Sequence, residues 1–105
     1  MTGRELLDLD QLELAAPLIR VAAHPLRLRI IDFLRQGDAC VGDIADVCQA
    51  SQAVTSQHLS TLRSAGVLAA ERQGQRVYYK LVRVELVRLL DCIREHCRLH
   101  EEEGS

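Results

Sequence analysis

The chain has 105 residues, of which 48% are apolar and 27% charged, with 6 Gly and 2 Pro. This composition is typical of one globular domain and excludes a fibrous or disordered chain. Every apolar stretch is interrupted, by Pro17, Arg20 or Arg88, before it reaches the roughly 20 residues that a membrane span needs. The acidic segment 1–10 lacks the features of a secretory signal, so we expect a cytoplasmic protein with no membrane partner.

The predicted elements begin with two helices. Apolar residues at helical spacing predict the first helix over about 10–23, with Pro17 as its weak point. The first helix should end before His24 and Pro25. Pro25 suits the first turn of a second helix that Gly37 can terminate. A short connection over 38–40 leads into the next segment.

Two shorter helices follow. The spacing predicts a helix over Val41–Cys48, a tight turn over 49–51 and a fourth helix that Ser51 caps. Val54, Leu59 and Leu62 are the expected apolar stripe of that fourth helix, and Gly66 is placed to end it in a left-handed conformation.

The spacing of the apolar residues changes from helical to alternating after Gly66. Alternation over about 67–82, around a polar turn at 73–75, predicts a β-hairpin, and spacings of three and four return in a last helix over about 84–100. The expected fold is one mainly α domain over residues 1–105, in the order ααααββα.

The polar face of the fourth helix is the most informative feature. Two short helices joined by three residues are typical of a helix-turn-helix, here over about 41–65. Short and amide-bearing side chains can enter a major groove about 12 Å wide, whereas a solvated helix more often carries Glu and Lys. These candidate DNA contacts are Gln52, Ala53, Thr55, Ser56, Gln57, His58 and Ser60.

The charge distribution favours the same partner. The net charge is -2, yet segment 51–80 carries four positive charges (Arg63, Arg72, Arg76 and Lys80) against Glu71 alone, which is +3. The hairpin over 67–82 would present a basic tip to phosphates. It would then act as the wing beside the fourth helix, which would be the recognition helix. The alternative is that this local excess of positive charge arose by chance on a solvated surface. Further candidate contacts from this segment are Arg63, Arg72, Gln75, Arg76 and Tyr78.

Five short segments of the sequence occur in an order that one family of regulators shares. The segments His24–Ile30, Cys40–Ala45, Ser51–Leu59, Leu62–Leu68 and Arg72–Tyr79 resemble the signature blocks of the ArsR/SmtB metalloregulator repressors, over about residues 15–82. The resemblance implies a homodimeric winged helix-turn-helix whose first and last helices form the dimer interface. It also implies binding to double-stranded operator DNA until an inducer releases it. Thr55 departs from the pattern, because the family usually has a branched apolar residue there.

The sensing sites of that family match this chain poorly. An arsenite-type site has C-V-C, and the chain has Cys40-Val41-Gly42, which retains one thiol. The zinc type lacks its first histidine here, since Asp91 is followed by Cys92 and Ile93. A persulfide type would pair a second-helix cysteine with one in the last helix, and the second helix offers Asp32 instead.

The last helix remains as a candidate sensor. Cys92, His96 and His100 are spaced by four, while Cys97 falls on the apolar stripe. Thiolates select soft ions such as arsenite, antimonite, cadmium or cuprous copper. We therefore expect Cys92 and Cys97 to sense an inducer, with a third donor from His96, Cys40 or a second chain. Packing of Cys97 as a small apolar residue in the dimer seam is the alternative.

The sequence also bears on other classes of function. The chain has no Gly-rich phosphate loop, nucleophile motif or recognisable pair of carboxylates, so we do not expect an enzyme. The expected function is a homodimeric repressor released by a thiol-binding soft metal or metalloid ion. A repressor that senses redox state or reactive sulfur through the same cysteines is an alternative. A constitutive winged-helix module for DNA or protein binding, without an inducer, is another.

Overall fold

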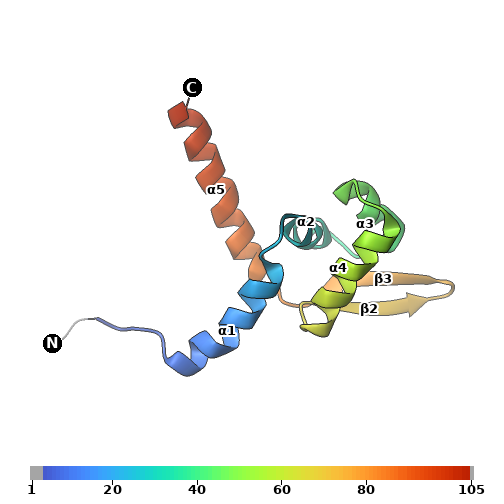
Figure 1. Ribbon diagram of the computed structural model, residues 1–105, viewed down its shortest axis with the longest axis horizontal. Helices are drawn as coiled ribbons and strands as arrows, with labels where there is room; N and C mark the ends of the chain where they lie inside the picture. Colours follow the sequence, from blue (N-terminus) through green and yellow to red (C-terminus); the bar gives the residue numbers. More distant parts are fainter. Residues whose placement is uncertain (1–3, 105) are drawn as a thin grey trace.

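The helix boundaries follow local signals in the chain. In the computed structural model, residues 4–104 are described, with side chains described as far as residue 99. The elements are α1 (Leu9–Ala22), α2 (Pro25–Leu34), β1 (Ala39–Cys40), α3 (Val41–Cys48), α4 (Gln52–Ser64), β2 (Leu68–Gln73), β3 (Arg76–Leu81) and α5 (Leu86–Gly104) (Figure 1).

Polar caps and one glycine set the predicted helix ends. Nδ1 of His24 accepts the Leu26 N–H at 3.1 Å, and Pro25 occupies the first turn of α2. Oγ of Ser51 accepts the Val54 N–H at 3.1 Å and caps α4, as predicted. Gly66, with φ of 78°, follows the end of α4 in the left-handed region that a Cβ would disfavour.

The sheet has three antiparallel strands in the order β1-β3-β2. The predicted hairpin pairs β2 with β3, from Leu68 opposite Leu81 to Gln73 opposite Arg76. Its connection is the two residues 74–75, one residue shorter than predicted, with Gly74 at φ of 66°. The two-residue strand β1 was not predicted, because two residues show no period of their own and the strand forms by pairing with β3, which is distant in the chain.

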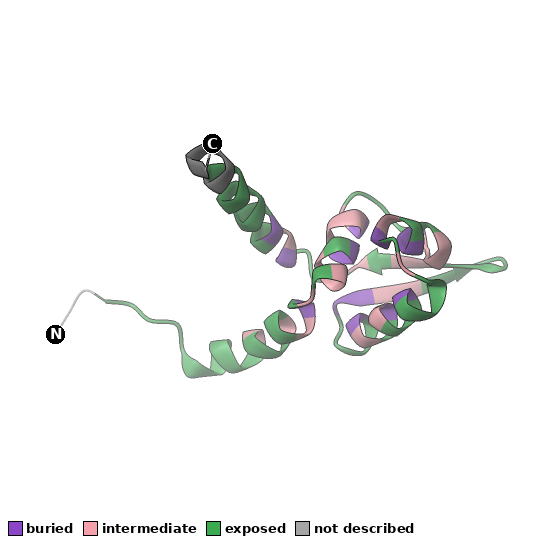
Figure 2. Ribbon diagram, turned by 45° about the horizontal axis from the view of Figure 1, so that its top comes forward, coloured by how far each residue is buried: buried purple, intermediate pink, exposed green. Residues whose placement is uncertain are grey.

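The core lies where α2, α3 and α4 pack on one another and on the sheet. Figure 2 shows the buried residues concentrated in this part of the molecule. The largest fully buried side chains belong to these elements and to the turn after α4, and they are Ile30, Ile31, Ile44, Leu59, Leu62, Val67 and Thr55. We call residues 25–82 the central body, because they supply most of the core.

The first and last helices extend away from the central body as two arms (Figures 1 and 2). Ala22 is the one buried residue of α1, and Leu86 and Leu90 are the buried residues among the described side chains of α5. Large apolar side chains of both arms are exposed, namely Leu9, Leu12, Leu14, Ile19, Leu89, Ile93 and Leu99. Among the described residues, no helix is both long and apolar enough to cross a bilayer.

Candidate nucleic-acid interface

The two helices of the predicted helix-turn-helix are joined by a tight turn. Gln49, directly after α3, adopts φ of 54° and is the one described non-glycine residue with positive φ. The N–H of Ala50 then donates to the carbonyl of Ala45 at 3.1 Å, which closes the end of α3. Three residues therefore suffice to turn the chain from α3 into α4, and the angle between the helices exposes one face of α4.

The exposed face of α4 carries most of the predicted contact residues. Ala53, Gln57 and Ser60 recur at spacings of four and three, which places them on one face of the helix. Ser56 and Arg63 flank this face on one side, and Gln52 lies at the start of the helix. All six residues are exposed and carry no carboxylate, so the face can approach the edges of base pairs and phosphates.

Thr55 corrects one predicted contact. Its side chain is 1% exposed, and Oγ1 is buried without a hydrogen-bond partner, so Thr55 cannot reach DNA. Thr55, Leu59 and Leu62 follow the spacing of four and three that a buried helix face requires. Val54, which was placed on the apolar stripe, is 41% exposed, because it lies one residue out of that phase.

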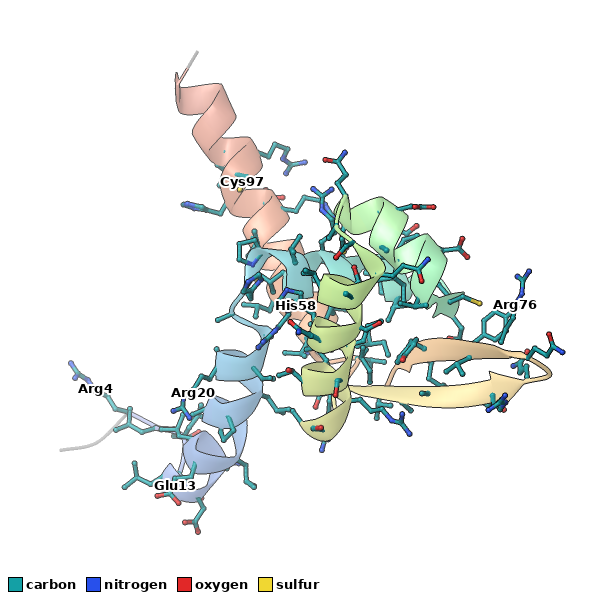
Figure 3. The ribbon with its side chains drawn as sticks, turned by 45° about the vertical axis from the view of Figure 1, so that its right-hand side comes forward. Arg4, Glu13, Arg20, His58, Arg76 and Cys97 are labelled. Carbon is teal, nitrogen blue, oxygen red and sulfur yellow. The ribbon has the colours of Figure 1, made fainter. Side chains whose placement is uncertain are left out.

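His58 differs from the other predicted contacts of α4. Its ring is half-buried and lies 4.5 Å from the ring of His24, measured between centroids. Nδ1 of His58 accepts a hydrogen bond from Nε of Arg27 at 3.2 Å. Figure 3 shows His58 on the side of α4 that faces the junction of α1 and α2, so its role is internal. The sequence contained a signal for this, since His58 lies three residues after Thr55 and four before Leu62.

The hairpin brings its basic residues to the surface. Arg72, Gln75, Arg76 and Lys80 are all exposed, and Figure 3 shows Arg76 at the outer end of the hairpin. Nε of Arg72 donates to the carbonyl of Gly74 at 3.2 Å, which holds that guanidinium at the turn. The tip therefore presents cationic donors beyond the packed part of the sheet, as expected of a wing that contacts phosphates.

Tyr78 differs from the other wing candidates. It is half-buried and lies in the middle strand, opposite Cys40 of β1 and Glu71 of β2. Because strand residues alternate between faces, Tyr78 lies on the face opposite Tyr79, which packs against the core. Arg76 and Lys80 share the face of Tyr78. The hydroxyl of Tyr78 is thus placed beside two cationic side chains and away from the core.

The two last-helix cysteines lie on different faces of α5. Both thiols are exposed and unoxidised. Cys97 lines a surface hollow of about 460 Å³ together with Asp32 of α2 and with Leu90, Ile93 and Arg94 of α5. Cys92 is five residues earlier, which is about 140° around the helix. The thiol of Cys97 therefore faces the contact between α2 and α5, and Cys92 does not.

Ion pairs cross that same contact. Arg94 bonds both carboxylate oxygens of Asp32, at 3.2 and 3.3 Å, and Arg35 bonds Asp91 at 2.8 Å. All four side chains keep contact with water, so these pairs contribute little to stability. Their consequence is geometric, since they orient α5 on α2 beside Cys97. Asp32 occupies the part of α2 where the persulfide-type site would have a cysteine.

Cys40 lies apart from the other residues that were predicted to sense an inducer. It lines a separate hollow of about 500 Å³ between the start of α3 and the wing, together with Gln75, Arg76 and Tyr79. The helix α5 extends away from the sheet (Figure 1) and makes its main contacts with α2. Within one chain, Cys40 therefore does not join Cys92 and Cys97. The geometric reason is that β1 holds Cys40 on the edge of β3.

The candidate ligands also do not converge within one chain. In the part of the chain whose side chains are described, no three His, Cys, Asp or Glu residues form a group that could hold a metal ion. His100 lies outside that part, and His96 has interactions of its own. Among the described residues, one chain alone therefore offers no converging set of three such donors to an ion at Cys92 or Cys97.

Comparison with known proteins agrees with this architecture. Residues 24–70 match the family model of the bacterial regulatory proteins of the arsR family. A curated relative, the HTH-type transcriptional repressor SmtB of Mycobacterium tuberculosis, is 40% identical over 78 residues, which are 74% of this chain. That alignment covers 54% of the relative, so the chain spans about half its length. A second relative, the transcriptional repressor SmtB homolog of Synechocystis, is 32% identical over 88% of this chain and 70% of its own length.

Solved structures share the whole fold. The homodimeric winged helix-turn-helix DNA-binding domain of Mb0332 from Mycobacterium bovis has a TM-score of 0.74 and 29% identity, over 98% of this chain and 95% of that one. The AntR antimony-specific transcriptional repressor has a TM-score of 0.78 and 27% identity, over 100% of this chain and 94% of that one.

These observations identify the class and then the family. Five helices, a small antiparallel sheet and an exposed polar helix beside a basic hairpin define a winged helix-turn-helix transcriptional regulator. The chain belongs to the arsR family of bacterial regulatory proteins. Its family is one of DNA-binding regulators and not of enzymes, so the expectation that the chain is not an enzyme is confirmed.

Proposed function

We propose that this chain acts as a homodimeric repressor that binds operator DNA through α4 and the wing. The exposed face of α4, polar and free of carboxylates beside a cationic hairpin, is the observation that carries the proposal. Gln57 and Ser60 would read base edges, while Arg63, Arg72 and Arg76 would bind phosphates. Two recognition helices related by a two-fold axis would occupy half-sites about one helical turn apart.

The exposed apolar residues of the two arms are an argument for a dimer. A monomer that left the apolar residues of α1 and α5 in water would expose more apolar surface than small soluble proteins ordinarily do. The similar domain of Mb0332 is homodimeric. We therefore place the dimer interface on the first and last helices, with Leu12 and Ile19 of α1 and Leu89 and Ile93 of α5 as its apolar residues.

We also propose that the inducer is a thiol-binding soft metal or metalloid ion held by Cys97 and Cys92. The related AntR is an antimony-specific repressor, and antimony in its trivalent form is a soft, thiol-seeking species. One chain supplies too few donors, so the partner chain would complete the site, with His96 as a further candidate. Because α2 contacts both α5 and the helix-turn-helix, a shift of α5 on α2 can reach the recognition helix.

A titration of the protein–operator complex tests this function. Arsenite, antimonite, cadmium, zinc and a polysulfide are added to separate samples, and DNA release is followed by fluorescence anisotropy. We expect release by a soft ion in the wild type, with a coupling of roughly 1–3 kcal/mol. Cys97→Ser and Cys92→Ser should raise the concentration needed, while Cys48→Ser, a buried control outside the site, should not.

Other outcomes of this titration would assign the cysteines a different role or contradict the proposal. Release by polysulfide alone would assign the cysteines to reactive-sulfur sensing. Unchanged release from the Cys92 and Cys97 variants would contradict the α5 site, and a loss confined to Cys40→Ser would move the sensor beside the wing. An absence of operator binding by the wild type would contradict the repressor itself.

A further inference from the structure

Three side chains join the recognition helix to the junction of α1 and α2. Nε–H of Arg27, in the first turn of α2, donates to Nδ1 of His58 on α4 at 3.2 Å. The rings of His58 and His24 are 4.5 Å apart at an interplanar angle of 48°. We call His24, Arg27 and His58 the junction cluster. None of the three was assigned to this role by the sequence.

The junction cluster also reaches the first arm. Nη1–H of Arg27 donates to the carbonyl of Val21, in the last turn of α1, at 3.0 Å. His24 caps α2 through Nδ1, which accepts the Leu26 N–H. One guanidinium therefore ties α1 and α4 to α2, and one imidazole both caps α2 and lies against His58. The position of α4 depends on all three residues together.

The hydrogen bonds require a particular proton distribution. A guanidinium is always charged and only donates, so Nδ1 of His58 must be an unprotonated acceptor. Nδ1 of His24 accepts a backbone N–H and must be unprotonated as well. Both rings are therefore neutral, with their proton on Nε2. Protonation of Nδ1 in either ring would place two N–H groups head to head and break the bond.

The surroundings of His58 oppose its protonation. Burial lowers the pKa of His58, and repulsion by a protonated His24 and by the charge of Arg27 acts in the same direction. Both neighbours belong to the segment that begins α2, and α1 contributes the Val21 carbonyl. Among the described residues, no carboxylate of α3 or of any other element is a cause of the shift.

We propose that the junction cluster positions the recognition helix, and that it does so only while the His58 imidazole is neutral, so that operator binding weakens on acidification. This inference rests on the proposed operator binding and adds to it a residue set that acts through α4 without touching DNA. His24, Arg27 and His58 are positioning residues. The dimer arm α1 and the DNA-reading helix α4 share them.

The direction of the effect distinguishes this account from ordinary electrostatics. Protonation of a histidine near DNA adds positive charge and strengthens phosphate binding. Protonation of the junction cluster acts the other way, because it releases α4. The neutral ring is favoured in the folded protein, so the contribution of the cluster is complete above the ordinary histidine pKa of about 6.5 and is lost as pH falls below it.

The first test measures operator affinity by anisotropy from pH 8.0 to 5.5 at constant ionic strength, on a duplex selected from random DNA by the wild-type protein at pH 7.5. We expect wild-type affinity to fall between pH 6.5 and 5.5, by less than the roughly tenfold that protonation of a histidine of ordinary pKa would give over that range, because the pKa of His58 is lowered. In His58→Asn, Oδ1 replaces the acceptor Nδ1 and does not titrate. This variant should bind within about twofold of the wild type at pH 7.5 and lose most of the acid sensitivity.

Two further variants complete the comparison. His58→Phe keeps a ring but has no acceptor, so it should bind weakly at every pH. His100→Asn removes a histidine near the end of the chain and should retain the full acid effect. A wild-type affinity that rises or stays constant on acidification would overturn the proposal, as would an acid effect that persists in His58→Asn.

The second test needs no DNA. Histidine ring resonances in the free protein report the tautomer and the pKa of each imidazole by NMR. We expect His58 and His24 to carry their proton on Nε2 at pH 7.5, and His58 to titrate below the ordinary range. A His58 that titrates normally, or that carries its proton on Nδ1, would refute the cluster. Absence of operator binding at every pH would instead contradict the proposed function, so the two failures are distinguishable.

Discussion

The central body and the arms of this protein are built in opposite ways. Residues 25–82 bury Ile30, Ile44, Leu59 and Leu62 between three helices and a sheet, whereas α1 and α5 bury only their ends nearest that body. The arms nevertheless carry most of the exposed large apolar residues. The body therefore folds on contacts within one chain, and the arms require contacts that one chain does not supply.

This difference in packing bears on the proposed release of DNA by an inducer. The helix-turn-helix lies in the packed part, so its geometry is maintained without a ligand. The thiols of Cys92 and Cys97 lie on an arm that is attached through α2 by exposed ion pairs and two buried leucines. Under the proposed function, an effector bound to the arm would have little packing to overcome, and its effect would reach α4 through α2.

A core substitution should have the largest effect. Leu59→Ala removes a fully buried side chain from the inner face of α4 and should lower the free energy of unfolding by about 2–5 kcal/mol. Denaturant unfolding followed by circular dichroism measures this loss. Leu99→Ala, on the exposed part of α5, is the matched control and should change body stability by less than about 0.5 kcal/mol. Equal losses in both variants would erase the distinction between body and arm.

A charge on an arm should break the dimer without unfolding the body. Ile93→Glu would place a carboxylate in the apolar interface and should cost at least about 2 kcal/mol of association, which is roughly 30-fold in the dimer dissociation constant. Sedimentation velocity measures the association, and circular dichroism measures the fold. Val82→Glu changes an exposed apolar residue outside the arms and should leave a dimer. Dissociation by Val82→Glu alone would move the interface to the body.

The DNA-facing surface should divide into specific and nonspecific contacts. Gln57→Ala should reduce discrimination between operator and random duplex by about 1–3 kcal/mol, because an amide can bond a base edge. Arg76→Ala should weaken binding to both duplexes equally. It should also reduce the slope of log affinity against log salt concentration by about one, which corresponds to the loss of one phosphate contact. Anisotropy titrations at several salt concentrations measure both. If neither substitution changes binding, α4 and the wing do not contact DNA.

The smallest expected effect is a gain in stability. Thr55→Val replaces a buried hydroxyl that has no hydrogen-bond partner with a methyl group of similar size. Removing an unsatisfied buried polar group should raise the free energy of unfolding by about 1 kcal/mol. Thr61→Val is a useful control, because Oγ1 of Thr61 donates to the carbonyl of Gln57 at 3.1 Å. A loss of stability in Thr55→Val would show that the hydroxyl is satisfied in solution.

Local signals made much of the fold predictable. The bounds of α3, the Ser51 cap and the glycine after α4 each follow from a residue and its immediate neighbours, and all are confirmed. The strand β1 could not be predicted, because two residues have no period of their own. It forms only where the edge of β3 is available.

The site was predictable in outline and less so in detail. The exposed residues of α4 follow from composition, and Leu59 and Leu62 are buried as predicted. Val54 was predicted to be buried and Thr55 to be exposed, and the structure has the reverse. The inward position of His58 depends on Arg27, which is 31 residues away in the chain. The separation of Cys40 from α5 depends on strand pairing. Long-range contacts of this kind leave no local pattern in one sequence.

The stoichiometry of the operator complex tests the central claim most directly. Sedimentation analysis of the protein with a duplex carrying one inverted repeat should give two chains per duplex, and the free protein should show no monomer at micromolar concentration. The same protein should bind an isolated half-site far more weakly. A folded monomer that binds the half-site as tightly as the full repeat would contradict the account, because the arms would then have no second chain to join.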